Sequence, residues 1–217
     1  MAIQIQGNAG TVADVDGANY RAIRVNQRPL DYGSLGTYSV SGRTGTMAAG
    51  LAANSPVFSF RWGDATRLCA ITSVHATGAG SIVAFTAGFT NLELLIARNF
   101  TASDSAGTAL TPTANNQKLR TSMGTSLVTD IRVSSTATLT AGTRTLDAQP
   151  IGSLTSSVTA TAGTPLWPPE HLYEAAENDG MPIILAQNEG IVIRATVPAT
   201  GTWTASFDMS WVELAAY

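Results

Sequence analysis

The sequence predicts an all-β protein, an antiparallel and jelly-roll-like β-sandwich with an extended N-terminal arm. Apolar and polar residues alternate over short segments, which is the pattern of half-buried strands. Turn-forming residues separate these segments at intervals of roughly 8 to 12 residues, as in sandwiches and barrels. No connection carries an amphipathic stretch of about 10 to 15 residues that could form a crossover helix. A chain of 217 residues can bury a core of this kind without disulfides or metal ions.

The clearest alternation lies near the C-terminus, where every odd-numbered residue from Trp203 to Trp211 is apolar and every even-numbered one is polar. A strand places these two sets on opposite faces. Residues 191–197 alternate in a similar way, and residues 198–201 contain the proline and glycine of a turn. We therefore expect an antiparallel hairpin over residues 191–211, preceded by a short strand at residues 183–185.

The middle of the chain predicts shorter strands, each bounded by glycine, asparagine, aspartate, serine or threonine. These strands are residues 57–62, 68–75, 81–89, 92–97 and 127–133. One short helix is predicted at residues 169–176, because proline suits the first helical position and early glutamates suit the positive end of the helix dipole. This helix would be an insertion in a loop.

The composition divides the chain into two regions. Residues 1–55 contain dispersed glycine, alanine, serine and arginine with strand character only at residues 20–25, and they predict an extended arm. Residues 56–217 predict the β-sandwich domain. An arm of this composition cannot bury much of its own surface, so it either stays mobile or lies on another molecule. Its candidate partner-binding residues are Arg21, Arg24, Arg28, Leu30, Tyr32 and Tyr38.

Titratable and nucleophilic residues form no catalytic pattern. The chain has one cysteine, Cys69, within an apolar segment, and two histidines, His75 and His171. Few residues are therefore available to form a catalytic triad or to bind a metal ion. His171 and Glu174 have the i, i+3 spacing that places two ligands on one face of a helix, but no third ligand is evident. We therefore predict no enzyme activity, no cofactor and no metal site.

Charge and hydropathy argue against two further classes of partner. A net charge of −3 with 12% charged residues lacks the basic stripe that a nucleic-acid binder needs. No window approaches the roughly 18 apolar residues of a membrane span, and the first ten residues lack the features of an export signal. We expect no nucleic-acid partner, no membrane partner and folding in the cytoplasm.

Three stretches of the chain resemble segments of virion proteins encoded among the structural genes of tailed bacteriophages. They are residues 116–123 (NQKLRTSM), 139–147 (LTAGTRTLD) and 185–194 (LAQNEGIVIR). The resemblance implies a jelly-roll cement or decoration protein, which commonly forms trimers over the capsid surface. The implied partners are the major capsid protein and further copies of this chain. The implied location is the capsid surface of the virion, after assembly in the host cytoplasm.

The tryptophans leave an alternative function open. Trp203 and Trp211 share a strand face with Phe207 and are assigned to the core. Trp167 stands between Leu166 and two prolines, so we expect it in a loop, as a contact for carbohydrate or for a neighbouring subunit. The alternative to a decoration protein is therefore a tail-fibre or baseplate module that binds host surface carbohydrate. A hydrolase with an unrecognised site is a third interpretation.

Overall fold

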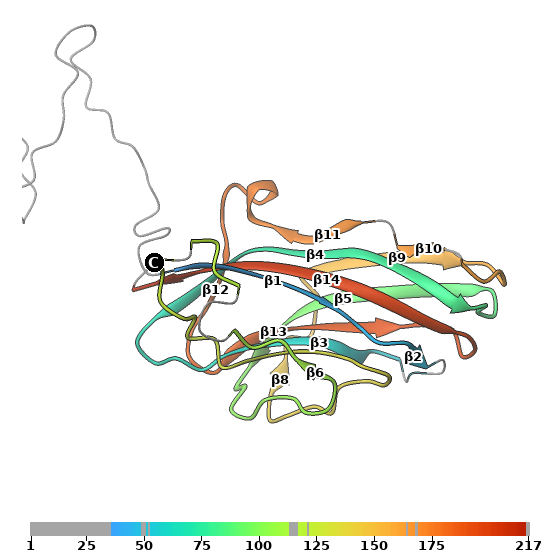
Figure 1. Ribbon diagram of the computed structural model, residues 1–217, viewed down its shortest axis with the longest axis horizontal. Helices are drawn as coiled ribbons and strands as arrows, with labels where there is room; N and C mark the ends of the chain where they lie inside the picture. Colours follow the sequence, from blue (N-terminus) through green and yellow to red (C-terminus); the bar gives the residue numbers. More distant parts are fainter. Residues whose placement is uncertain are drawn as a thin grey trace, which may run out of the picture.

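The protein is an all-β sandwich, as the alternation predicts. A computed structural model describes residues 36–48, 51, 53–112, 117–120, 122–163, 165–167 and 169–215. These residues form two seven-stranded antiparallel sheets that pack face to face (Figure 1). We name them the β4 sheet and the β5 sheet, after a long strand in each.

Each sheet combines long strands with short ones. The β4 sheet contains β1 (Thr37–Arg43), β2 (Met47–Ala48), β4 (Leu68–Val83), β10 (Pro165–Trp167), β11 (Glu170–Glu174), β12 (Ile183–Leu185) and β14 (Thr202–Leu214). The β5 sheet contains β3 (Ser55–Trp62), β5 (Gly88–Arg98), β6 (Thr108–Ala109), β7 (Asp130–Val133), β8 (Thr145–Leu146), β9 (Gly152–Val158) and β13 (Glu189–Thr196). A single 3-10 turn, η1 (Ala175–Glu177), follows β11.

The order of pairing has jelly-roll topology. From the middle of the chain outward, β5 pairs with β9, β4 with β10, β11 and β12, β3 with β13, and β1 with β14. The chain is thus one long antiparallel double strand whose successive pairs lie alternately in the β5 sheet and the β4 sheet. Rolling such a double strand around a core yields a jelly roll. Strands β6, β7 and β8 lie in the long connection between β5 and β9 and extend the β5 sheet.

Aromatic side chains fill the space between the sheets. Trp211 on β14 stacks on Tyr38 of β1 at a centroid distance of 5.5 Å, and it meets the edge of Phe60 of β3 at 5.3 Å. Phe207 of β14 lies 5.9 Å from Phe58 of β3. All five side chains are buried, and aromatic side chains contribute large apolar areas to a core. The predicted core face of residues 203–211 is therefore confirmed.

The predicted hairpin over residues 191–211 is wrong, because its two strands lie in different sheets. β13 pairs with β3 and β5, whereas β14 pairs with β1, β2 and β4. The turn between them crosses from one sheet to the other. Gly201 has a φ of +101°, and a Cβ there would lie 2.8 Å from the carbonyl oxygens of Val83 and Ala84. Only glycine fits this close crossing.

Two further elements differ from the sequence prediction. The strand predicted at residues 81–89 is the end of β4, a crossing turn and the start of β5. The helix predicted at residues 169–176 is the strand β11 followed by η1. Pairing with β4 satisfies the backbone of β11 along one edge, and this tertiary contact outweighs the local preference for a helix.

The sandwich begins earlier than the predicted boundary at residue 55. β1 pairs with β14 from Thr37 to Arg43, and β2 pairs with the start of β14. Tyr38 and Val40 point into the core from β1, an alternation that the sequence analysis overlooked. Residues 1–35, which include most of the predicted arm, lie outside the described residues.

Candidate functional site

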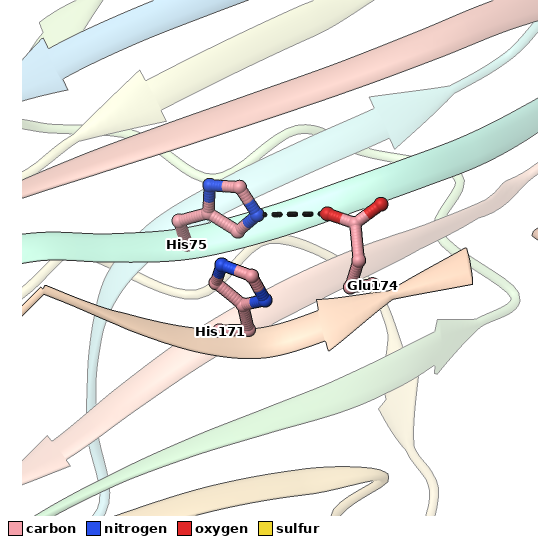
Figure 2. Close-up of side chains that lie close together, drawn as sticks. All are labelled: His75, His171 and Glu174. Carbon is pink, nitrogen blue, oxygen red and sulfur yellow. Dashed lines mark hydrogen bonds and ion pairs between the residues drawn. The ribbon is translucent and has the colours of Figure 1, made fainter. Parts of the chain in front are cut away.

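Both histidines of the chain meet one glutamate on the surface of the β4 sheet (Figure 2). His75 belongs to β4, while His171 and Glu174 belong to β11. The His75 Nε2 atom lies 3.0 Å from Glu174 Oε2. The two imidazole rings stack with their centroids 4.3 Å apart and their planes 15° from parallel. We call these three residues the histidine cluster.

The antiparallel register brings the cluster together. His171 lies directly opposite His75, and Glu174 lies opposite Ser73, so Glu174 is the diagonal neighbour of His75. Val74 and Ala76 point into the core on either side of His75. Because side chains alternate along a strand, His75 projects from the outer face of the β4 sheet. The cluster is therefore accessible from outside the sandwich.

A β-bulge at Leu172 places Glu174 on the same face as His171. In a regular strand, residues three apart point to opposite faces. Here the register skips Leu172, since His171 pairs with His75 and Tyr173 pairs with Val74. Leu172 is buried and Tyr173 packs against the same core, so two successive residues point inward. This extra residue returns Glu174 to the outer face.

Two more carboxylates border the histidine cluster. The Nδ1 atom of His171 lies 3.2 Å from Glu177 Oε1, on η1. Asp208 of β14 lies opposite His75 on the other side of β4. One of its oxygens, Oδ1, is buried and has no hydrogen-bond partner among the described residues. The cluster therefore lies in a locally acidic part of the outer face.

The sequence analysis paired His171 with Glu174 but did not place His75 beside them, and for want of a third ligand it predicted no metal site. The spacing of His171 and Glu174 does place them on one face, although the cause is a bulged strand and not a helix. His75 comes 99 positions before Glu174, and only the register of β4 with β11 brings it near. Alternation around His75 predicts its face but not its cross-strand partner.

Trp167 is buried in the core, so the predicted loop position is wrong. Its side chain is 2% exposed and meets the edge of Trp203 at a centroid distance of 5.7 Å. The cause is a bulge in β10, where Pro165 pairs with Gly80 and Trp167 with Ala79, leaving Leu166 as the extra residue. Leu166 and Trp167 therefore both point inward.

Of the other predicted partner-binding residues, one lies in the core and the rest lie outside the described part of the chain. Tyr38 is buried within the chain's own sandwich and donates a hydrogen bond from its hydroxyl to the carbonyl of Gly124 at 3.0 Å. It is a core residue in this structure and not part of an arm. Five residues lie outside the described part of the chain: Arg21, Arg24, Arg28, Leu30 and Tyr32.

Three large apolar side chains are exposed around the turn between β4 and β5. Phe89, the second residue of β5, is 73% exposed, and Ile82 and Val83 at the end of β4 are also exposed. This turn lies at the right-hand end of the sandwich in Figure 1. Single exposed apolar residues are common on proteins. Three within eight residues, on strands of both sheets, mark this end of the sandwich as a candidate contact region.

A buried carboxylate fixes the end of β14. Glu213 is fully buried; it accepts hydrogen bonds from Ser126 Oγ and the Leu127 amide, both at 2.8 Å, and forms an ion pair with Arg67 at 3.3 Å. Burial raises the pKa of Glu213, although these hydrogen bonds and Arg67 act in the opposite direction. Burial also raises the pKa of the Cys69 thiol, as expected for a structural cysteine and not for a nucleophile.

Comparisons with known proteins identify no relative of this chain. No protein-family model, curated protein or solved structure matches it. Within the described residues, no helix has the length and apolar character needed to cross a membrane.

Proposed function

We propose that this protein is a structural component of a phage virion that decorates and stabilises the capsid as a homo-oligomer, with a trimer favoured. The observation that carries the proposal is the exposure of three large apolar side chains, Ile82, Val83 and Phe89, at one end of the jelly roll. The resemblance of three sequence stretches to tailed-phage virion proteins gives this association its context.

These exposed apolar side chains favour association, because their contact with water has an unfavourable free energy that burial against a partner removes. Burial of one large apolar side chain contributes about 1.5 to 3 kcal/mol, and Phe89 is the most exposed of the three. The turn that carries these residues is tied to the neighbouring turn by Thr86, whose amide donates to Thr200 Oγ1 at 2.9 Å. A surface held in one conformation loses little entropy on binding.

The carbohydrate-binding alternative has lost its main support. It depended on an exposed Trp167 in a loop, and that side chain lies in the core. The decoration role depends on association surfaces, and it needs neither an exposed aromatic platform nor a catalytic group. We therefore propose this role alone.

The first test is the oligomeric state of the full chain in sedimentation velocity. We expect a homo-oligomer for the natural protein and a shift toward monomer for the double variant Val83→Ser, Phe89→Ser. The matched control is Met181→Ser, which changes an exposed apolar residue elsewhere on the surface and should leave the oligomer intact. A natural chain that stays monomeric at all concentrations would contradict the association.

The second test is the position of the protein in the virus particle. Gold-labelled antibodies against the chain should decorate the heads of intact virions of the phage that encodes it. Labelling confined to tails or baseplates would overturn the capsid role, and only the proposed homo-oligomer would remain. The two tests together separate the oligomer from its place in the particle.

A further inference from the structure

We propose that the histidine cluster binds one divalent transition-metal ion, with Zn²⁺ as the best-matched ion, on the outer face of the β4 sheet. Its ligands would be one ring nitrogen from each of His75 and His171 and one carboxylate oxygen of Glu174. These three ligand atoms all lie within 4.8 Å of one another. The site is separate from the apolar end of the sandwich and does not depend on the proposed role in a virion.

One pair of ligand atoms already has a spacing close to that of an occupied site. Ligands at about 2.1 Å from a tetrahedral zinc ion stand roughly 3.4 Å from one another. The His75 and Glu174 atoms are already 3.0 Å apart. His171 is the residue that must move, because its ring stacks on that of His75 and the in-plane lone pairs of stacked rings do not converge. Its side chain is 47% exposed, so the ring can turn toward solvent without displacing core side chains.

The types of ligand select the class of ion. Imidazole nitrogen suits Zn²⁺, Cu²⁺, Ni²⁺ and Fe²⁺, whereas Mg²⁺ and Ca²⁺ prefer sites made of oxygen alone. Two histidines and one glutamate form the ligand set of known zinc sites that keep further positions for water. The partial exposure of His75 and Glu174, 28% and 23%, leaves room for such water molecules.

The surroundings supply the negative charge and the support that such a site needs. Within the described part of the chain, Glu174 and Glu177 pair with histidines and not with arginine or lysine, so a cation there need not displace a strong ion pair. Metal-bound histidines commonly donate their second ring N–H to a carboxylate, which fixes the tautomer and the ring orientation. Glu177, which lies 3.2 Å from His171 Nδ1 before the ring turns, is near enough to accept this N–H when Nε2 binds the ion.

A bound ion would connect β4 to β11 on both sides of the bulge. His75 comes from the long strand β4, while His171 precedes Leu172 and Glu174 follows it, next to η1. Because the ion binds the folded register and not the unfolded chain, it should raise the melting temperature of the protein.

The test is calorimetric titration of Zn²⁺ into the metal-free full chain, prepared without a histidine tag. We expect saturable binding of one ion per chain. Loss of an outer partner of a metal ligand lowers affinity by about 10- to 100-fold at known sites, so His75→Ala, His171→Ala and Glu174→Gln should each lower it by at least that much. The matched control is Glu170→Gln, on the same strand and opposite Ala76, which should bind Zn²⁺ like the natural chain.

The outcomes that overturn the proposal are equally specific. They are the absence of saturable binding, or binding that the three ligand variants leave unchanged. Thermal melts of each metal-free variant verify that it is folded, and Glu174→Gln keeps the shape of the side chain should an alanine variant unfold. Co²⁺ provides an independent readout, because ligation by His75 and His171 should produce a visible absorption spectrum that both alanine variants lose.

Discussion

The two neighbours of β4 in its sheet are built in opposite ways. On one side, β14 runs along β4 from Thr202 to Leu214 as a single strand. On the other side, the edge consists of three short strands, β10, β11 and β12, with bulges in β10 and β11. The bulges between β4 and β14 leave the alternation of β14 intact, because the skipped residues, Thr72, Thr77 and Ile82, all belong to β4.

The regular strand and the bulged edge therefore have different roles: the first stabilises the core, and the second places polar side chains on the surface. Regular alternation along β14 sends every second side chain into the core, so this strand contributes mainly to packing. The bulged edge sends Leu166 and Trp167 inward together, and it returns Glu174 to the surface beside His171. Bulges are known to re-aim side chains in this manner near functional sites. We therefore expect substitutions in β14 to change stability and those at the outer face of β11 to change binding.

The largest effect on stability is expected in the core face of the regular strand β14. Trp211→Ala removes a fully buried indole that contacts Tyr38 and Phe60. The lost contacts and the cavity should lower the free energy of unfolding by about 3 to 5 kcal/mol, measured by denaturant titration. Ser206→Ala, on the outward face of the same strand, should change it by less than about 0.5 kcal/mol. Equal effects of the two substitutions would contradict the assignment of faces.

A comparable or smaller loss of stability is expected from removal of the bulge residue. Deletion of Leu172 removes a buried leucine at a cost of about 2 to 5 kcal/mol. It should also leave Tyr173 opposite Val74 and Glu174 opposite Ser73, as in the bulged register. We therefore expect a less stable protein that retains the affinity of the histidine cluster for Zn²⁺.

The matched change is an insertion in the same strand. One alanine added between Tyr173 and Glu174 should turn the glutamate away from His171, because side chains alternate, and should abolish Zn²⁺ binding. Calorimetry of the two variants compares them directly. Loss of binding in the deletion, or its survival in the insertion, would show that the bulge does not set the face of Glu174.

At the end of β14, we expect the buried Glu213 to have a moderate effect on the free energy of unfolding, and this effect should depend on pH. The pKa of Glu213 is raised in the folded protein from its ordinary value of 4.5, so between pH 4.5 and the raised pKa the native state binds more protons than the unfolded chain. The contribution of Glu213 to stability is therefore complete below pH 4.5 and is lost as the pH rises through the raised pKa. Glu213→Gln cannot titrate and should cost about 1 to 3 kcal/mol at pH 4.5.

Denaturant titrations from pH 4.5 upward measure this effect. The difference in free energy of unfolding between the natural chain and Glu213→Gln should shrink toward neutral pH. A difference that stays constant, or that grows with pH, would contradict a raised pKa for the buried carboxyl.

The same contrast explains how much of the structure could be predicted from the sequence. Alternation from Trp203 to Trp211 identifies a strand and its buried face, because the strand itself is regular. Alternation cannot identify partners, so the hairpin with residues 191–197 was predicted although those residues pair with β3 and β5. Loops that cross between sheets have the same turn residues as hairpins.

The candidate site was harder to predict for a related reason. A bulge adds one residue without any marker in composition, so residues 169–176 carried helix signals and no clear strand pattern. The bulge in β10 likewise turned Trp167 from a predicted loop contact into a core residue. The partner of His171 depends on register, which is a property of the whole sheet.

The smallest effect on stability is expected at the histidine cluster. His171→Ala removes a stacked ring and a polar contact with Glu177 in which both side chains are largely exposed. Exposed pairs of this kind contribute about 0 to 1 kcal/mol, so the metal-free variant should unfold within that range of the natural chain. Zn²⁺ should raise the melting temperature of the natural chain and leave that of the variant unchanged. A metal-free His171→Ala protein that is destabilised as strongly as Trp211→Ala would mean that the bulged edge supports the core, and that the division between β14 and β11 does not hold.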